Sequence, residues 1–295
     1  MEWTARKRRA SFSVLDGPPF TTTLVCTYRI VMARFKPKHA NDEYANLVRY
    51  TELRTREISG MAQPYIQVTD RYGRLIARLT LLLGGINPSG TQDVTVRDLM
   101  ADVFDCLYES RSLILSGKCT VTYPIARRAY ESLSLLHLCT LDATWAERWE
   151  RGVKISNKDI RRGLAKHPMG EPEAQTKELY NFFCLATHPN RDLVPYRFLG
   201  RGNSFVLGVI GKPDLILVTD YAMKHLEMWF WLTATVSYFY RRQINDQDKS
   251  YFHAYMEAYK QAKAVKSDLA ENFNRLLREA QSEHAKRSSS RKGAV

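Results

Sequence analysis

Residues that interrupt helices or cross-link chains are scarce in this sequence. Among 295 residues there are 15 glycines, 11 prolines and five cysteines, while 44% of the residues are hydrophobic. This balance predicts a chain that folds over most of its length around a sizeable core. The cysteines are widely spaced and form no C-x-x-C pair, which argues against a disulfide framework and a thiolate zinc site. We therefore expect a reducing, cytoplasmic setting.

Long apolar runs are also missing. No uninterrupted stretch reaches the roughly 18 residues that a membrane-spanning helix needs, and the N-terminus lacks the basic, apolar and small-residue order of a secretory signal. The densest apolar stretch, MWFWLTATVSYFY at residues 228–240, is too short and keeps the periodicity of a helix. Neither an internal repeat nor a glycine-rich phosphate loop occurs. We predict no membrane partner and no cofactor.

The charge is strongly positive but unevenly distributed. Of the net charge of +13, the first ten residues supply +3 and residues 285–295 supply +4, which leaves +6 for the body of the protein. A moderate excess of this kind is compatible with RNA or DNA binding and equally with an ordinary solvated surface. A nucleic acid partner is therefore permitted by the charge and not required by it.

The first part of the chain divides into an arm and a long helical segment. Residues 1–40 have no helical periodicity and predict a basic, poorly ordered arm, or an upstream segment that translation from Met32 would omit. Residues 41–92 predict one long helix or a helix pair, kinked or divided at Pro64 and ended by glycines 84 and 85. Its apolar positions alternate spacings of three and four, which indicates a seam that needs a partner helix. The seam consists of Ile58, Met61, Tyr65, Val68, Tyr72, Leu75, Leu79 and Leu82.

Residues 93–245 predict a helical core. Thr95 and Asp98 have the spacing of a capping box at a helix start, and so do Ser156 and Asp159. Pro124 is expected in the first turn of the next helix. A short helix is expected at about residues 144–150, and a longer one at 171–188 that Pro189 ends.

The remaining chain predicts two long helices. After a poorly helical stretch at residues 192–213, where SFVLGVIG could form a short strand, a helix follows Pro213 and should lie at the centre of the core. Its expected buried face comprises Val218, Tyr221, His225, Met228, Leu232, Val236 and Phe239. Residues 246–284 predict a final long helix, and residues 285–295 a disordered basic tail. The predicted class is an all-α helical bundle with long flanking helices and little or no β structure.

Charged residues interrupt the apolar helix ARRAYESLSLLHLC at residues 126–139. At about 100° per residue, Arg127 and Glu131 lie on one side, opposite Leu133 and Leu136. A helix that is apolar nearly all round is expected to be buried, so the charged side should also face protein. Because an isolated buried charge is costly, we expect Arg127 to be neutralised by a carboxylate, which Glu131 can supply four residues away.

A second apolar helix, ELYNFFCLATHPNRD, carries Tyr180, Cys184 and His188 at intervals of four. His188 stands at the expected helix C-terminus, where the carbonyl dipole favours the imidazolium form. If this face meets Arg127 and Glu131, a polar cluster forms between two apolar helices. Such a cluster could transfer protons through His188 and stabilise a phosphate charge through Arg127. It could equally be a latch that only joins the two helices.

These residues resemble the motifs of a family of bacterial helical domains of unknown function. The motifs are R-x-x-x-E, here Arg127 to Glu131, and a Y-x(7)-H-P pattern, here Tyr180 to Pro189. The resemblance covers roughly residues 95–242, and these domains are similar to the HEPN superfamily, which includes metal-independent ribonucleases of toxin and phage-defence systems. It implies a HEPN-like core and an RNA-directed activity in which Arg127, Glu131, Tyr180 and His188 take part. The nuclease members carry arginine and histidine on one helix. Here no arginine precedes His188 at that spacing, and Arg127 would have to come from another helix.

Weaker alternatives concern other residues. His137 and His225 could join His188 in a metal site, but no E-x-x-H pattern supports one. Trp229, Trp231, Tyr238 and Tyr240 could stack on bases, although such spacing is more typical of a core. We are left with two hypotheses: a metal-independent ribonuclease or RNA-binding protein, and a non-catalytic interaction module that forms a homodimer through the seam or the final helix.

Overall fold

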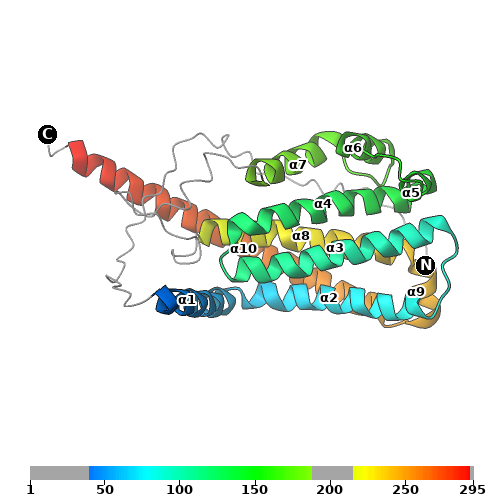
Figure 1. Cartoon of the computed structure of the whole chain (residues 1–295), viewed down its shortest axis with the longest axis horizontal. Coiled ribbons are helices and arrows are strands. Elements are labelled where there is room, and N and C mark those ends of the chain that lie inside the picture. Colours follow the sequence, from blue (N-terminus) through cyan, green and yellow to red (C-terminus); the bar gives the residue numbers. More distant parts are fainter. Residues whose placement is uncertain (1–39, 188–214, 293–295) are drawn as a thin grey trace.

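The computed structural model describes residues 40–187 and 215–292, which form helices α1 to α10 (Figure 1). No strand occurs in these two ranges, so the predicted all-α class is confirmed. The N-terminal arm with Met32, the suggested strand in SFVLGVIG, and His188 all lie outside the described residues. Within the described ranges no helix is both long and apolar enough to cross a membrane.

The long N-terminal segment is a pair of helices, as its proline predicts. Helix α1 spans Ala40–Met61 and α2 spans Gln63–Gly84, with Pro64 in the first turn of α2. Proline has no N–H to donate and is best tolerated in the first turn of a helix, so the division falls at Ala62, two residues before Pro64. In Figure 1, α2 runs along the long axis, whereas α1 is seen nearly end-on.

Helices α3 (Thr91–Leu115) and α4 (Cys119–Leu141) begin earlier than we predicted. The Asp93 carboxylate accepts a hydrogen bond from the Ser89 backbone N–H at 3.0 Å and so supports the N-terminus of α3. Thr95 therefore lies inside the helix, where its hydroxyl donates to Glu150 at 2.8 Å, and the capping box predicted at Thr95 is wrong. The prediction for Pro124 is also wrong, because α4 starts at Cys119 and Pro124 lies in its second turn.

Three shorter helices follow: α5 (Ala143–Glu150), α6 (Asn157–Lys166) and α7 (Glu173–Thr187). The predicted capping box at the start of α6 is confirmed, since the Asp159 N–H donates to the Ser156 hydroxyl at 3.1 Å and the Ser156 N–H donates back to the carboxylate at 3.2 Å. Helices α6 and α7 cover the side of α4 that faces away from α3 (Figure 1). This outer layer is where the polar residues of α4 find their partners.

Helices α8 (Leu215–Phe239), α9 (Arg241–Gln247) and α10 (Tyr251–Lys292) complete the bundle. Helix α8 is central, and its predicted face is buried as far as Val236, while Phe239 is half-buried. Helix α10 continues through Lys292, so most of the tail predicted to be disordered at 285–295 is helical, and residues 293–295 lie outside the described ranges. The C-terminal half of α10 extends beyond the other helices (Figure 1).

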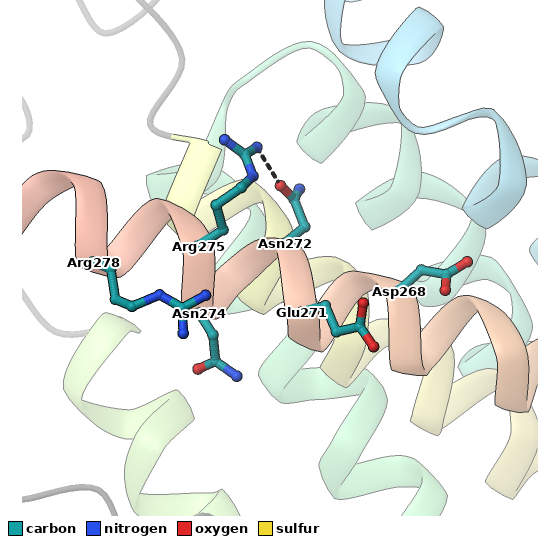
Figure 2. A pocket seen from close by; sticks show the side chains of 6 residues that line it. All are labelled: Asp268, Glu271, Asn272, Asn274, Arg275 and Arg278. Atoms are coloured by element: carbon teal, nitrogen blue, oxygen red, sulfur yellow. Dashed lines mark hydrogen bonds between the residues drawn. The ribbon is translucent and has the colours of Figure 1, made fainter.

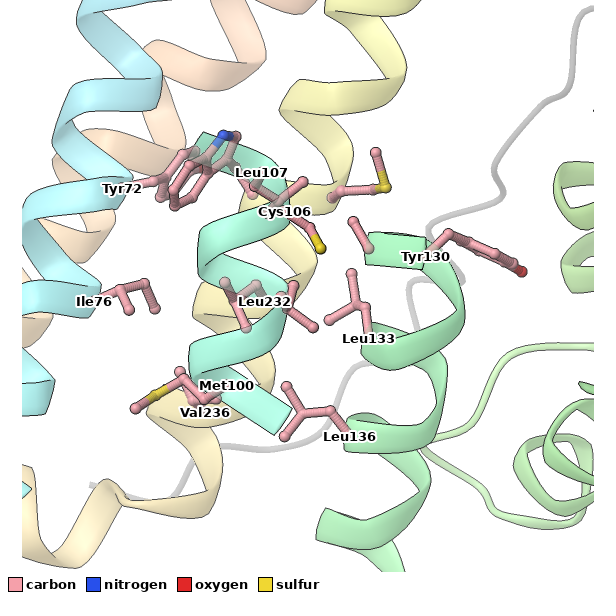
Figure 3. Close-up of a cluster of buried hydrophobic side chains, with 14 of the residues drawn as sticks. Tyr72, Ile76, Met100, Cys106, Leu107, Tyr130, Leu133, Leu136, Leu232 and Val236 are labelled. Atoms are coloured by element: carbon pink, nitrogen blue, oxygen red, sulfur yellow. The ribbon is translucent and has the colours of Figure 1, made fainter. Parts of the chain in front are cut away.

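The core lies among α2, α3, α4, α8 and α10. Figure 3 shows side chains of α2, α3, α4 and α8 converging between the helices, among them Tyr72, Leu107 and Leu232. Each large apolar side chain removed from water contributes about 1.5–3 kcal/mol to folding. The part of the seam on α2 belongs to a helix that packs against α8 and α10 of the same chain. Ile58 and Met61 lie on α1, where Ile58 is buried and Met61 is 54% exposed. The α2 part of the seam is therefore occupied within the chain, and of the two dimer interfaces that the sequence suggested this leaves the final helix.

Two histidines are buried in this core in the neutral form. The Tyr65 hydroxyl lies 2.6 Å from His225 Nδ1, and His225 Nε2 lies 2.9 Å from the Leu107 carbonyl oxygen. A neutral ring that accepts from the tyrosine and donates to the carbonyl satisfies both contacts. Burial lowers the pKa of His225 to about 3 and that of His137, whose Nδ1 accepts from the Trp231 indole N–H at 3.1 Å, to about 4.

One end of the bundle is joined by a buried charge network. Arg97 donates to the Asp93 carboxylate at 2.9 Å and to the backbone oxygens of Leu83 and Ile86, both at 2.9 Å. The Tyr240 hydroxyl donates to the same carboxylate at 2.7 Å. Burial raises the pKa of Asp93, but its hydrogen bonds outweigh this effect and leave the pKa below its usual range. The network satisfies carbonyl groups at the C-terminus of α2 and connects α2, α3 and the end of α8.

Candidate functional site

The polar residues predicted on two separate helices lie together between α4, α6 and α7. Arg127 Nε donates to Glu131 Oε1 at 2.8 Å, and Arg127 Nη2 donates to the Tyr180 hydroxyl at 3.1 Å. From α6, Asn157 Nδ2 donates to the same Glu131 oxygen at 3.0 Å, and the Arg161 guanidinium lies 4.9 Å from the centre of the Tyr180 ring. We call these five residues the Arg127 cluster.

The apolar residues around the cluster explain its position. On α4, Tyr130 is buried and donates a hydrogen bond from its hydroxyl to the Thr176 carbonyl of α7 at 2.9 Å. The Tyr130 ring lies 5.6 Å from that of Phe183, which is also buried. These contacts hold α7 against α4, so that Tyr180, one turn before Cys184, lies over Arg127. Amphipathic packing of two helices therefore determines which polar groups meet.

The cluster is partly open to solvent. The side chains of Arg127 and Glu131 are 24% and 31% exposed, so both remain in contact with solvent. The hydrogen bond to Glu131 is the largest of the effects that raise the pKa of Arg127, which therefore stays a cation at every pH at which proteins fold. The predicted pairing of Arg127 with Glu131, and the expectation that this side of α4 faces protein, are both present in the structure.

Two members of the cluster, Asn157 and Arg161, were not predicted from the sequence. Asn157 and Arg161 occupy one face of α6 at a spacing of four, immediately after the capping box that begins the helix. The capping box located α6 correctly, but nothing in a short helix of basic residues indicates which face meets α4. Gly163 provides that contact, because a Cβ atom at this position would lie 2.8 Å from a methyl group of Leu138. The close approach at Gly163 turns Asn157 and Arg161 towards the cluster.

Three histidines were considered for the site. His188 follows Thr187, the last residue of α7, and lies outside the described residues. His137 and His225, the two histidines considered for a metal site, each hold the hydrogen bonds described above within the core. In residues 40–187 and 215–292, no group of three or more histidine, cysteine or acidic side chains has the arrangement of a metal site.

Other surface features do not converge on a site. A shallow hollow is lined by Asp268, Glu271, Asn272, Asn274, Arg275 and Arg278. Figure 2 shows that all six come from α10 and point to different sides of that helix, while Arg275 already donates to Asn272 at 2.7 Å. The aromatic residues considered for base stacking lie on α8 and just after it. Trp229 and Tyr240 are buried and Trp231 is half-buried, as expected for residues of the core. Tyr238 is 61% exposed.

The Arg127 cluster combines two guanidinium groups, one carboxylate, a phenol and an amide. These groups can bind an anion, because the two cations exceed the single negative charge of Glu131. Proton transfer at neutral pH would require a further group such as His188. Comparison with models of known protein families, with curated proteins and with solved structures finds no match. The resemblance to HEPN-like domains therefore stays a prediction from the motifs.

Proposed function

We propose that this protein is a HEPN-like, RNA-directed protein of the cytoplasm that cleaves or binds RNA without a metal ion, in a defence or toxin-type system. The observation that supports the proposal is the contact between the two motif helices, in which Arg127 of α4 donates to the Tyr180 hydroxyl of α7. Charged groups gathered at a partly exposed contact between helices are typical of functional sites, although structural ion pairs share this arrangement. The net positive charge of the chain is compatible with a polyanionic ligand.

The proposed roles follow from the chemistry of RNA cleavage. The ribose 2′-hydroxyl loses a proton as its oxygen bonds to phosphorus, and the 5′-oxygen of the next nucleotide leaves and takes up a proton. In this scheme His188 exchanges protons, and Arg127 stabilises the negative charge that develops on the phosphate oxygens. Glu131 holds the Arg127 guanidinium in position, and Tyr180 offers a hydroxyl beside it. No step needs a metal ion.

The test uses purified full-length protein and RNA in the presence of EDTA. We expect RNA cleavage that is lost in His188→Ala and reduced about 100-fold or more in Arg127→Met, because a positioned cation is removed from the transition state. Arg128→Met is the matched control. Arg128 is the next residue of α4, its side chain is 68% exposed, and it pairs with Asp102 of α3 instead of the cluster. Circular dichroism must show that all three variants are folded. Equal activity in the Arg127 and Arg128 variants would refute the assigned role.

A non-catalytic interaction module is the second candidate, and one observation favours it. Arg127, Glu131, Asn157 and Tyr180 satisfy one another by hydrogen bonds, as a latch between α4, α6 and α7 would. Because the seam on α2 is occupied within the chain, a homodimer would form through α10, whose C-terminal half extends beyond the bundle. Inert protein, an Arg127→Met variant that melts earlier, and a dimer by analytical ultracentrifugation would together support this candidate.

A further inference from the structure

Two guanidinium groups lie over the same aromatic ring in the Arg127 cluster. The Cζ atom of Arg127 is 5.3 Å from the centre of the Tyr180 ring, and that of Arg161 is 4.9 Å from it. Both distances fall within the range of a cation–π interaction. Two cations close to one ring repel each other, so this arrangement is unfavourable unless negative charge is present nearby.

Arg161 is held in this position without acceptors for its buried donors. Its Nε and Nη1 atoms are enclosed by protein and have no hydrogen-bond partner among the described residues, whereas Nη2 is not enclosed in this way. Enclosed donors that lack an acceptor cost about 1–3 kcal/mol, and more when the group is charged. The Arg161 guanidinium therefore carries a charge that its buried donors do not share with any acceptor in the described part of the chain, and Nη2 is its one nitrogen that is not enclosed. A ligand anion that approached Nη2 would offset the charge of the guanidinium, while Nε and Nη1 would stay enclosed by protein.

The carboxylates of the described residues do not neutralise Arg161. Glu131 accepts hydrogen bonds from Arg127 and Asn157, and no ion pair joins it to Arg161. Glu171 makes no ion pair within the described residues either, and burial raises the pKa of its carboxyl with no cation acting against this. The cluster thus carries one positive charge in excess, located on the guanidinium whose donors are unused.

We propose that Arg161 and Arg127 form a binding site for a phosphate group beside the Tyr180 ring. The ligand class is a phosphodiester or phosphomonoester, because its oxygens can accept hydrogen bonds from two guanidinium groups at once and its charge offsets their repulsion. The inference rests on the proposed function for the identity of the natural ligand, which would be a phosphate of RNA. Arg161 is new to the site, since the motifs do not contain it.

The test measures thermal unfolding of the full chain with inorganic phosphate, against sodium chloride at equal ionic strength. A single site at ten times its dissociation constant raises the melting temperature by about 3 °C. We expect this increase in the wild-type protein, its loss in Arg161→Met, and its reduction in Arg161→Lys, which keeps the charge but not the planar group. Arg162→Met is the control. Arg162 follows Arg161 on α6 and its side chain is 56% exposed, so this substitution should leave the increase in melting temperature unchanged. Any general effect of phosphate on protein stability is common to all four proteins.

A second measurement covers the effect of the substitution on the fold. Without phosphate, Arg161→Met should melt within about 2 °C of the wild-type protein, since only a cation–π contact is lost while unsatisfied buried donors are removed. A larger decrease would show that the fold itself satisfies Arg161 and would overturn the proposal. A full increase with phosphate in Arg161→Met, or none in the wild-type protein, would also overturn it.

Binding of an oligonucleotide that cannot be cleaved separates this inference from the proposed function. A 2′-O-methyl oligoribonucleotide is titrated into the wild-type, Arg161→Met and Arg162→Met proteins, with affinity as the readout. Weaker binding in Arg161→Met alone, with no cleavage of ordinary RNA by the wild-type protein, would support the phosphate site and exclude the ribonuclease. Cleavage of RNA with equal affinities in all three proteins would support the ribonuclease and exclude the phosphate site.

Discussion

Acidification from pH 7 to pH 5 should destabilise this protein through two histidines in its core. His225 is fully buried and His137 is 9% exposed. Both rings accept a hydrogen bond at Nδ1, from the hydroxyl of Tyr65 and from the indole of Trp231 respectively. A proton added to either ring would have to occupy a nitrogen that already receives a hydrogen bond, in a site from which water is excluded. The folded protein therefore resists protonation at a pH at which the unfolded chain accepts it.

The sign and size of the effect follow from the pKa values. An unfolded histidine has a pKa of about 6.5, whereas the folded values are about 3 for His225 and about 4 for His137. The stability that depends on these neutral rings is present above pH 6.5 and is lost as the pH falls towards the folded values, because the unfolded state binds more protons. Between pH 7 and pH 5 each histidine contributes a loss of about 2 kcal/mol, or about 4 kcal/mol for both.

Carboxyl groups interfere little in this range. The lowered pKa of Asp93 matters mainly near pH 3.8, where the unfolded carboxyl is half protonated. Burial raises the pKa of Glu171, so its folded form takes up protons earlier and acts in the opposite direction. The net loss should therefore stay close to the sum from the two histidines.

The assay is urea unfolding followed by circular dichroism at pH 7 and pH 5. The wild-type free energy of unfolding should fall by about 4 kcal/mol, and His137→Gln and His225→Gln should each reduce that difference to about 2 kcal/mol, because glutamine does not titrate. Comparing the two pH values within each variant cancels the packing cost of the substitution. Equal wild-type stability at both pH values, or an unchanged difference in the variants, would refute the reasoning.

Three further predictions concern the contacts that place the cluster and close the bundle. Arg97→Ala should lower the free energy of unfolding by about 3 kcal/mol, because a buried carboxylate and two carbonyl oxygens lose their donor. Gly163→Val should cost about 1–3 kcal/mol, since its side chain would overlap Leu138, whereas Gly60→Ala, with no atom within 4 Å, should stabilise by about 0.5–1 kcal/mol. Ser156→Ala should cost about 1 kcal/mol through loss of the helix cap.

Urea unfolding at pH 7 measures all of these changes. Arg74→Ala is the control for Arg97, because Arg74 is an exposed arginine of α2. A loss in Arg97→Ala no larger than in this control would contradict the network. Equal effects of the substitutions at Gly163 and Gly60 would show that α6 does not approach α4 as closely as the structure indicates. Unchanged stability in Ser156→Ala would mean that the capping box is not needed for α6.

The candidate site was partly predictable because its members follow simple spacing. Arg127 and Glu131 are four residues apart on one helix, so their pairing is a local property of α4. That Tyr180 meets Arg127 could be stated only as a condition, since it depends on how α7 lies against α4. Arg161 was not predicted at all. Its position follows from the contact between Gly163 and Leu138, and a contact between distant residues leaves no periodic pattern in the chain.

The sequence by itself determined the helical class, the division of the first helix at Pro64, and the start of α6 at its capping box, because each depends on neighbours within a few residues. Local signals were less reliable where several competed, as at Thr95, where Gly90 and Asp93 begin the helix earlier. Only the tertiary structure decided that the seam of α2 is covered by α8 and α10, and that α6 completes the Arg127 cluster. Apolar burial has no direction, so a hydrophobic face indicates that a partner exists without specifying which one.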